Sequence, residues 1–413
     1  MKKNKLLLVS LFAIMAICSC NGNNNSSSQE PTSEASIYVS YGTSEEVSEN
    51  QSSSKELNED RISQIINGDF EVLLNSVKTE DVVSIHTEKQ KNYLNDNYNN
   101  VSNYANGDSE SSKPNPVTLT WESNLVNENV VDYYQVNVSE NSDMSSSWVY
   151  KCEDTTLDVY NLKVGTTYYW NVETKIQDLT FKTETYSFET ADEVIRNIYI
   201  DGVTNARDLG GWKISETQRV KQGLMYRTGR LNKNYMNIVS RQITAKGREM
   251  MTNYLGIKTE MDLRRVENNE VGSITSSPIG SSVNYYQCPM VYDSEENTLV
   301  NNSPMIREIF KVLSDESNYP LFYHCSIGTD RTGVICFLIN ALLGVEEEYL
   351  YKDYLFSMFG HITVSRMPST IDKYIEMIKP SQGTTLQEKT YNYLVGLGVA
   401  ESDLNNLIDI MTN

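Results

Sequence analysis

The sequence predicts a multidomain protein in which an all-β sandwich is followed by an α/β domain with a helical C-terminal half. Between residues 117 and 190, short runs alternate apolar and polar residues and are separated by turn residues, which is typical of antiparallel strands. From about Asp192 onward, short apolar runs alternate with helix-like segments, which indicates an α/β domain. Helical spacing then continues almost without a break from Tyr349 to Met411. A chain of 413 residues is long enough for two or three such domains.

The N-terminus has the pattern of an export signal. Three lysines among the first five residues precede the apolar run Leu6 to Ile17, which is too short for an ordinary membrane span. The run ends in Ile17-Cys18-Ser19-Cys20, which resembles a bacterial lipobox with Cys20 as the lipidated residue. This resemblance implies an exported lipoprotein, with residues 1–20 as its signal peptide, anchored to the outer face of the bacterial cell membrane. The alternative is a secreted protein whose signal is cleaved without lipidation.

Two segments between the signal and the β pattern carry little apolar periodicity. Residues 21–56 are rich in Asn, Ser and Glu, and we expect a disordered tether there. Residues 57–112 predict a short helical and linker region, because helical spacing between Leu57 and Ile85 gives way to a polar stretch from Lys89. The pattern of these residues predicts no function for the region.

Residues 113–191 are expected to form the sandwich. The stretch from Leu162 to Val172 resembles the L-x-P-G-x-x-Y segment of fibronectin type III domains, with Val164 where proline is usual. The resemblance implies a fibronectin type III-like fold, with Tyr168 as its corner tyrosine and Trp121 as an early core tryptophan. We interpret the aromatic residues of this region as core packing rather than as a sugar-binding platform.

Residues 192–413 are expected to form the α/β domain, with a site at the carboxyl ends of its strands. Strands are predicted at Ile198–Ile200, Gly223–Tyr226, Thr259–Leu263, Asn284–Cys288 and Leu321–Tyr323. Helices are predicted at Thr244–Leu255 and Met305–Ser314.

The most informative stretch runs from His324 to Gly333, where Cys325 and Arg331 bracket five residues. A strand-like run leads into it and a helix-like run leads out. Such a loop directs backbone N–H groups inward with a helix N-terminus behind them, which makes a cup for a tetrahedral oxyanion. Those dipoles and the guanidinium favour a thiolate, so the thiol should be acidic. This combination predicts cysteine-dependent hydrolysis of phosphate esters.

The loop resembles the H-C-x-x-G-x-x-R-[ST]-G signature of the protein tyrosine phosphatase superfamily. Asp330 before the arginine resembles the bacterial branch, which acts on phosphotyrosine and on broader substrates. Three further segments resemble that branch in the same order, namely Asn205–Trp212, Gly223–Gly229 and Gly256–Arg264. The resemblance covers about the last half of the chain and implies a phosphatase domain at residues 192–413 that needs no cofactor and no metal. The presence of only three histidines also argues against a histidine-rich metal site.

Roles follow for the residues of the loop. Cys325 is the expected nucleophile, and Arg331 is the expected clamp for the phosphoryl oxygens, because its planar fork can hold two of them. We expect Thr332 to hydrogen-bond the thiolate, and His324 to orient the loop. The predicted phosphate-binding loop comprises Ser326, Ile327, Gly328, Thr329 and Thr332.

Three carboxyl groups are candidates for the general acid that protonates the leaving oxygen. Asp330 lies in the loop itself, at a position that resembles that of the acid in the bacterial branch. Asp293 lies upstream at a distance that resembles the mobile acid loop of dual-specificity phosphatases. Asp262 ends a predicted strand, and its alternative role is an ion pair with a nearby arginine. We rank them in that order.

Two further features affect the pocket. Thr329 stands where the bacterial branch commonly has lysine, so one positive charge is absent, which disfavours highly anionic lipid headgroups. Arg207 and Asp208 precede a Gly-Gly turn, and we interpret them as a buried ion pair rather than as substrate contacts.

The sequence therefore predicts a cell-surface tyrosine phosphatase whose partners are a phosphotyrosine protein, or another phosphomonoester, and a membrane reached through the lipid anchor. A phosphoinositide or inositol-phosphate phosphatase is the alternative enzyme. A non-catalytic surface protein that binds a phosphorylated ligand is the alternative of a different class. The net charge of −20 argues against nucleic acid as a partner.

Overall fold

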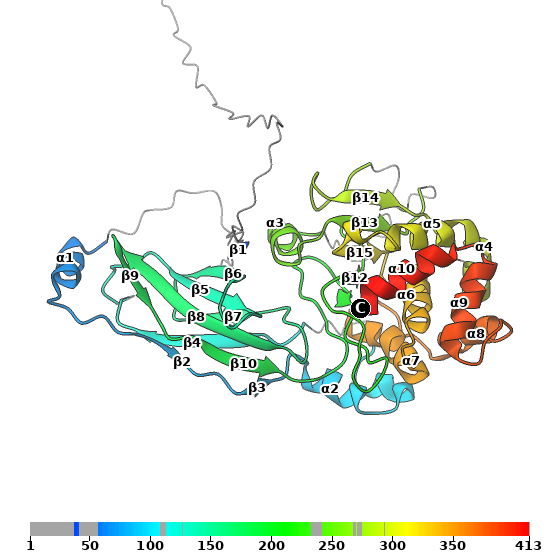
Figure 1. The fold of residues 1–413 in the computed structure, drawn as a ribbon, viewed down its shortest axis with the longest axis horizontal. Helices are drawn as coiled ribbons and strands as arrows, with labels where there is room; N and C mark the ends of the chain where they lie inside the picture. The colour runs from blue at the N-terminus through cyan, green and yellow to red at the C-terminus, as the bar shows by residue number, and fades with distance from the viewer. Residues whose placement is uncertain are drawn as a thin grey trace, which may run out of the picture. The chain divides into compact units, whose positions relative to one another are not determined.

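The computed structural model describes residues 37–40, 57–107, 113–125, 127–232, 242–266, 270, 275–292 and 294–412. The predicted signal with Cys20, most of the predicted tether and the candidate acid Asp293 lie outside these residues. The chain combines an N-terminal β-sheet region with a C-terminal α/β domain (Figure 1), as the sequence predicts at this level. Within the described ranges, no helix is both long enough and apolar enough to cross a membrane.

The β region consists of two sheets that share one apolar core. The larger sheet has the order β1 (Ile37–Ser40), β6 (Trp148–Cys152), β5 (Tyr134–Ser139), β8 (Thr167–Ile176), β10 (Tyr186–Thr190) and β3 (Val82–Val83), with β9 (Leu179–Lys182) paired to β8. The smaller sheet has the order β2 (Leu74–Val77), β4 (Val117–Ser123) and β7 (Thr156–Val159). Alternate residues of β4 are buried, and Trp121 joins Tyr134 and Trp170 of the larger sheet in the same hydrophobic cluster. The Tyr168 hydroxyl accepts a hydrogen bond from the backbone N–H of Lys163 at 2.8 Å.

The sheets begin earlier in the chain than the predicted boundary at residue 113. The helix α1 (Glu59–Asn67), capped by the side chain of Asn58, lies where helical spacing is predicted. The next apolar residues, however, form β2, which pairs antiparallel with β4, and β3 pairs parallel with β10. A short apolar run such as Val72 to Val77 fits a helical and a strand period about equally well, and pairing with β4 decides between them.

Residues 87–107, which we call the strap, are a second departure from the predicted linker. They form α2 (Glu88–Leu94), which begins in a capping box at Thr87, and the 3₁₀ helix η1 (Tyr98–Asn103). Tyr93, Val101 and Ala105 of the strap are buried in the hydrophobic core of the α/β domain. The Lys352 ammonium also donates to the carbonyl of Leu94 at 2.8 Å. The strap is therefore part of the α/β domain's core although it precedes most of the β region in sequence.

The α/β domain is built on a five-stranded sheet whose central strand leads into the predicted loop. The strand order is β11 (Arg207–Asp208), β12 (Met225–Thr228), β15 (Leu321–His324), β13 (Thr259–Asp262) and β14 (Asn284–Gln287). All neighbouring pairs are parallel except β11 with β12. The strand predicted at Ile198–Ile200 is absent, and Asn197 forms only an isolated bridge with Arg207.

Most helices of this domain (Figure 1) lie where helical segments are predicted, whereas α4 and η3 lie in segments for which the sequence predicts no helix. They are α3 (Ala245–Glu249) with the π-helical turn η2 (Met250–Tyr254), α4 (Glu295–Asn301), α5 (Ser303–Leu313), η3 (Glu316–Asn318), α6 (Asp330–Leu342), α7 (Glu347–Phe356), η4 (Ser357–Phe359), α8 (Ser369–Ile378), α9 (Leu386–Gly396) and α10 (Glu401–Thr412). Every residue of α6 from Arg331 to Leu342 is buried, and α7 and α9 pack against this helix. A helix that is enclosed on all sides gives the loop before it a rigid support.

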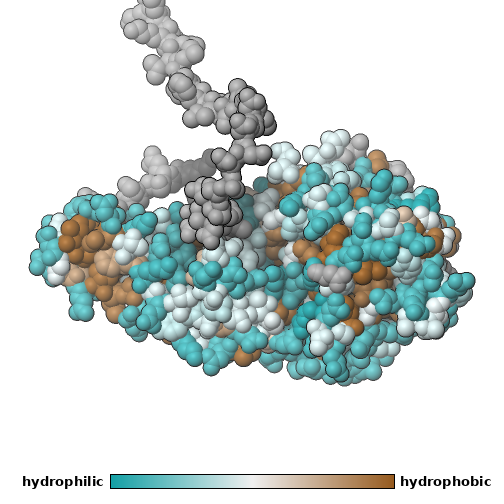
Figure 2. Space-filling model, in the orientation of Figure 1, coloured by the Kyte–Doolittle hydropathy of each residue, from teal (hydrophilic) through white to brown (hydrophobic). Residues whose placement is uncertain are grey.

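The surface is mainly hydrophilic, as the net charge of −20 leads one to expect. On the face of the molecule drawn in Figure 2, hydrophobic residues gather beside α1. Ile66 of α1 and Leu73, just before β2, are exposed to 44% and 42%, respectively. This apolar surface belongs to the β region and not to the loop from His324 to Gly333.

The strap should contribute strongly to stability through Tyr93. Its ring is fully buried between Tyr104, Phe356 and Phe359, and its hydroxyl has no hydrogen-bond partner among the residues described. Tyr93→Ala should lower the free energy of unfolding by about 3 to 5 kcal/mol, because it removes a large ring from a packed core. Tyr93→Phe is the matched control and should change it by less than about 1 kcal/mol, or stabilise the fold, because the lost hydroxyl is unpaired. Urea unfolding of the two variants measures both values. Equal free energies of unfolding for Tyr93→Ala and Tyr93→Phe would contradict the strap's place in the core.

Candidate active site

The predicted loop lies at the carboxyl end of the central strand. Cys325 follows β15 directly and is 1% exposed, and α6 begins at Asp330. Gly328 has φ of 74°, and a Cβ atom there would lie 2.4 Å from the carbonyl oxygen of Thr228. Both the backbone conformation and the close approach of β12 therefore require glycine at this position.

Side chains from two other motifs hold the loop's carbonyl groups. The Asn205 amide donates to the carbonyls of Ile327 at 3.0 Å and Gly328 at 3.1 Å. The Arg227 guanidinium donates to the same Gly328 carbonyl at 2.7 Å, and Arg230 donates to the Ser326 carbonyl at 3.1 Å. When carbonyls are fixed by outside donors, the loop's N–H groups remain for an anion, because C=O and N–H point in opposite directions in a trans peptide.

The buried ion pairs behind the loop differ from the predicted Arg207–Asp208 pair. Both residues are buried, but Asp208 pairs with Arg196 at 2.8 Å. Arg207 instead lies 3.9 Å from the Asp353 carboxylate, which also pairs with Arg227 at 2.7 Å. Neighbours in a strand point to opposite faces, so adjacent residues of β11 meet different partners. One carboxylate therefore serves two guanidinium groups, and the region behind the loop keeps an excess of positive charge.

The surroundings of Cys325 make its thiol acidic. Burial alone would raise the pKa of Cys325, but the charge of Arg331 and hydrogen bonding from Thr332 lower it below its ordinary value against an opposing effect of Asp330. No other group in the described part of the chain binds the buried Thr332 hydroxyl, so it is left for the Cys325 sulfur. In contrast, burial raises the pKa of Cys288 and Cys336 to about 12 each, so neither is a reactive thiol at neutral pH.

Arg331 is held by Glu270, a residue for which the sequence predicts no role. The Nη1 atom of Arg331 donates to Glu270 Oε2 at 2.8 Å, and its Nη2 atom contacts Glu270 Oε1. The same carboxylate accepts from Ser326 Oγ at 2.9 Å and from the backbone N–H of Arg265 at 2.8 Å. Burial would raise the pKa of Glu270, but these bonds and the Arg331 charge lower it to about 2. Arg331 Nε has no partner among the described residues and remains for a phosphoryl oxygen.

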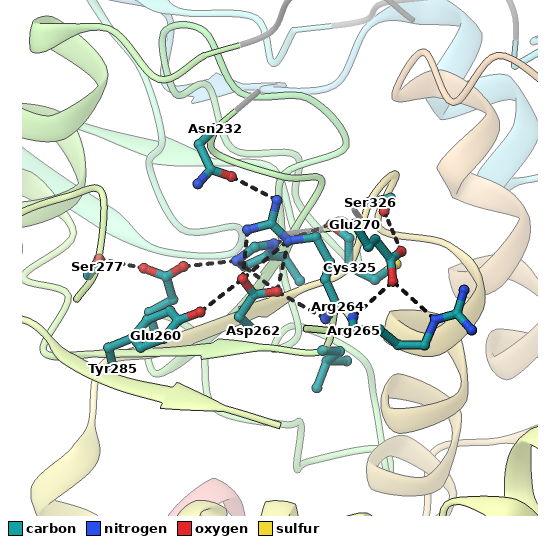
Figure 3. Close-up of polar contacts among 12 residues, drawn as sticks. Asn232, Glu260, Asp262, Arg264, Arg265, Glu270, Ser277, Tyr285, Cys325 and Ser326 are labelled. Carbon is teal, nitrogen blue, oxygen red and sulfur yellow. Dashed lines mark hydrogen bonds and ion pairs between the residues drawn. The ribbon is translucent and has the colours of Figure 1, made fainter. Parts of the chain in front are cut away.

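His324 belongs to a buried charged network beside the loop, and its neighbours Glu260, Asp262 and Arg264 in this network are labelled in Figure 3. Its Nε2 atom lies 2.9 Å from Glu260 Oε1, and its Nδ1 atom lies 3.2 Å from the Cys325 carbonyl. Burial would lower the pKa of His324, but Asp262 and Glu260 raise it overall, so the ring carries positive charge more readily than usual. The network therefore positions the predicted nucleophile, Cys325, through its backbone.

Asp262 is placed in this network rather than toward the thiol. It bonds bidentately to Arg264, with Nε to Oδ1 at 2.9 Å and Nη2 to Oδ2 at 2.6 Å, and accepts from the Tyr285 hydroxyl at 3.1 Å. Burial would raise the pKa of Asp262, but His324 and Arg264 lower it overall. A carboxyl group with a lowered pKa and occupied oxygens is a poor proton donor.

The same network places Glu260, Asp262 and His324 close enough to be considered as metal ligands, with one donor atom of each within 4.8 Å of the others. The donor atoms already have partners, however. Arg264 binds both oxygens of Asp262, and Glu260 bonds to His324 and to the hydroxyl of Ser277. A cation would have to displace these partners, so the three residues do not fit a metal site.

Asp330, the first-ranked acid, is at the first residue of α6 and next to the clamp Arg331. Its carboxylate pairs with Arg366 at 3.0 Å, and the same guanidinium donates to Thr329 Oγ1 at 2.8 Å. The structure thus brings Cys325, Arg331, Thr332 and Asp330 together on one loop and helix start, and leaves Asp262 in the network beside them. Glu270 and Arg366 are additional residues at this site that lie 55 residues before and 41 residues after Cys325 in sequence.

The C-terminal part of the chain is similar to known proteins. A model of the tyrosine phosphatase family matches residues 198–412. No curated protein matches the chain. Among solved structures, the core catalytic domain of the PP-IP phosphatase Siw14 from S. cerevisiae is 14% identical, covering 45% of this chain and 93% of that one, with a TM-score of 0.28. A second structure of the Siw14 catalytic core is 13% identical, covering 44% and 87%, with a TM-score of 0.29. At such identities and TM-scores, neither structure indicates a substrate for this chain.

The acidity of Cys325 can be measured by alkylation. The rate of iodoacetamide labelling of the chain, with the Cys325→Ser variant subtracted, should rise with a midpoint below the ordinary thiol pKa of about 8.5. Thr332→Val should raise that midpoint, because it removes the hydroxyl that helps to stabilise the thiolate. A midpoint at or above 8.5 for the wild type would contradict the electrostatic description of the loop.

The Glu270 carboxylate should stabilise the fold and hold Arg331 in place. Because its pKa is lowered on folding, its contribution is fully present above the unfolded value of about 4.3 and is lost as the pH falls through about 2. Glu270→Gln should therefore lower stability at pH 7 by on the order of 3 kcal/mol and remove this part of the acid dependence. It should also lower kcat by roughly tenfold to a hundredfold, because Arg331 loses its fixed geometry. Urea unfolding at several pH values tests the stability effect, and steady-state kinetics test the effect on kcat. Glu308→Gln, which changes an exposed carboxylate, is the control. Wild-type stability and kcat in Glu270→Gln would contradict the proposed contribution of Glu270.

Proposed function

Because the chain belongs to the tyrosine phosphatase family, we propose that it is a cysteine phosphatase that hydrolyses phosphomonoesters, with phosphotyrosine proteins as the leading substrate class. The observation that carries the proposal is a buried thiol with a lowered pKa, in a loop whose carbonyls are tied back by Asn205, Arg227 and Arg230. Such a loop is suited to a bound phosphate dianion and to a thiolate nucleophile at once.

The first step transfers the phosphoryl group to the enzyme. The Cys325 thiolate attacks phosphorus, an S–P bond forms, and the bond from phosphorus to the ester oxygen breaks. Asp330 gives its proton to the departing oxygen, which leaves as an alcohol or phenol. Arg331 Nε and the loop amides stabilise the charge on the equatorial oxygens as the phosphoryl group moves.

The second step returns the enzyme to its starting state. A water molecule attacks the phosphorus of the phosphocysteine, Asp330 accepts a proton from it, and the S–P bond breaks. Inorganic phosphate leaves, and the Cys325 thiolate is restored with hydrogen-bond support from Thr332. Asp330 enters the first step protonated, so its carboxylate must leave the ion pair with Arg366 and take up a proton from solvent before the reaction. The proton that it accepts from water in the second step restores this acid form.

The two alternative functions differ in their support. An inositol-phosphate or phosphoinositide phosphatase is favoured by Arg366, because this cation beside Thr329 offsets the missing lysine. A non-catalytic binder of phosphorylated ligands would need only Arg331 and the loop amides. The acidic thiol distinguishes an enzyme from such a binder, since binding alone requires no nucleophile.

The remainder of the chain gives the proposal its setting. We propose that the β region is a fibronectin type III-like spacer, which the Tyr168 hydrogen bond to the Lys163 N–H supports, because a corner tyrosine makes this contact. Its smaller sheet then starts with β2, so the spacer extends N-terminal to residue 113. We propose further that Cys20 carries a lipid and that the enzyme acts on the outer face of the bacterial membrane, as the lipobox-like sequence suggests.

Turnover without added metal tests the proposed reaction. The chain should hydrolyse p-nitrophenyl phosphate and a phosphotyrosine peptide in the presence of a chelator, and Cys325→Ser should lose at least about a thousandfold in kcat. Asp330→Asn should lose roughly a hundredfold to ten-thousandfold with an ester that has a poor leaving group, and less with p-nitrophenyl phosphate. Asp293→Asn is the matched comparison for the other candidate acid. Wild-type turnover that survives Cys325→Ser would contradict the mechanism, and no turnover at all would favour the binder.

A further inference from the structure

We propose that Arg366 takes the place of the missing loop lysine and binds a second anionic group, a phosphate or a carboxylate, next to the scissile phosphate. This inference rests on the proposed phosphatase reaction and specifies its substrate class. The sequence has threonine at position 329, where the bacterial branch commonly has lysine. In the fold, the guanidinium of Arg366 lies next to this threonine and supplies a positive charge there.

The contacts of Arg366 place its charge at the loop. Nη2 donates to Thr329 Oγ1 at 2.8 Å and lies 3.0 Å from Asp330 Oδ1 and 3.1 Å from Asp330 Oδ2. Its side chain is 17% exposed, so the charge is near solvent but partly shielded by protein. Its buried Nε atom has no hydrogen-bond partner among the described residues. The guanidinium thus has a spare donor and lies directly beside Thr329.

The segment that carries Arg366 is held by the strap. The backbone N–H of Gly107 donates to the Met358 carbonyl at 3.1 Å, and the N–H of Thr363 donates to the Gly107 carbonyl at 2.7 Å. Ser365 Oγ, next to the arginine, donates to the Asn106 carbonyl at 3.1 Å. A Cβ atom on Gly107 would lie 2.4 Å from the Val364 carbonyl oxygen, which shows how closely the two segments approach. Arg366 therefore extends from a segment that is bonded to packed structure, rather than from a free loop.

The ion pair between Arg366 and Asp330 connects binding with catalysis. In the structure, the Asp330 carboxylate uses both oxygens on Arg366. A second anionic group on the substrate would compete for this guanidinium and so release Asp330 to meet the leaving oxygen. Substrates with such a group should therefore gain in binding and in the availability of the acid.

The overall charge of the protein makes a local cation necessary for such substrates. A chain with a net charge of −20 repels polyanions at long range, so a pocket that accepts them requires positive charge close to the site. A planar guanidinium with free N–H groups suits phosphate and carboxylate oxygens, which it can bind through two parallel hydrogen bonds.

Matched small substrates test the proposal on the full chain. Phenyl phosphate is compared with 2-carboxyphenyl phosphate, and an inositol monophosphate is compared with the corresponding vicinal bisphosphate. The variants are Arg366→Ala, Arg366→Lys and the double variant Thr329→Lys with Arg366→Ala, which moves the cation back into the loop. Arg307→Ala removes one exposed positive charge from α5 and is the control for net charge.

The proposal predicts a change in selectivity. Arg366→Ala should lower kcat/KM for at least one of the doubly anionic substrates by about tenfold to a hundredfold more than for its singly anionic partner, mainly through KM. The 2-carboxyphenyl and bisphosphate arms show whether the second group is a carboxylate or a phosphate. Arg366→Lys and the double variant should each restore part of the selectivity, and Arg307→Ala should not alter it.

Other outcomes would overturn the inference. An equal fall for both members of each pair would mean that Arg366 only positions Asp330. Unchanged selectivity in Arg366→Ala would also contradict a role in binding. So would a double variant, Thr329→Lys with Arg366→Ala, that restores no selectivity. If the phosphatase proposal itself is wrong, the wild type should turn over none of these substrates. Turnover of phenyl phosphate by the wild type therefore shows that an unexpected result concerns only the role of Arg366.

Discussion

The site of this domain depends on one electrostatic arrangement: positive charge that is held in place lies beside a buried sulfur atom and favours its ionised form. Cys325 is almost entirely buried, which by itself opposes ionisation. The balance comes from Arg331, whose guanidinium is fixed by Glu270, and from the hydroxyl of Thr332. Behind the loop, Arg207 and Arg227 share the single carboxylate of Asp353, so that side of the site also remains positive. A phosphate that enters the loop meets the same field that favours the thiolate.

The fold supplies rigid supports for each of these charges. The loop lies between the central strand β15 and the enclosed helix α6, and its carbonyls are bonded to side chains that flank or belong to β11 and β12. The strap adds a support that the C-terminal half alone does not contain. It places Tyr93, Val101 and Ala105 in the domain's core and bonds to the segment that carries Arg366. The catalytic unit therefore includes residues from before β4, although the family model begins at residue 198.

How far the sequence predicts this structure depends on how the information is distributed along the chain. The loop from His324 to Gly333 is contiguous, and its strand, glycine and helix start can be read from neighbouring residues. The alternating residues of β4 and the apolar α6 are predicted for the same reason. Glu270 and Arg366 could not be predicted in this way, because nothing near them in sequence indicates that they meet Arg331 and Asp330 in the fold. The strap resembles a linker in sequence because it is polar overall and its buried residues are few. The predicted partner of Asp208 is wrong because its true partner, Arg196, lies outside the motif.

The central claim is that the Cys325 sulfur forms a covalent bond to phosphorus, and trapping that intermediate tests it most directly. Wild-type enzyme mixed with a radiolabelled phosphomonoester and quenched within milliseconds should carry the label on the peptide that contains Cys325. The account predicts that the label appears before steady state, disappears as substrate is consumed and is absent from Cys325→Ser. Phosphate release by the wild type with no label on this peptide at any time, under conditions that preserve a thiophosphate ester, would contradict it.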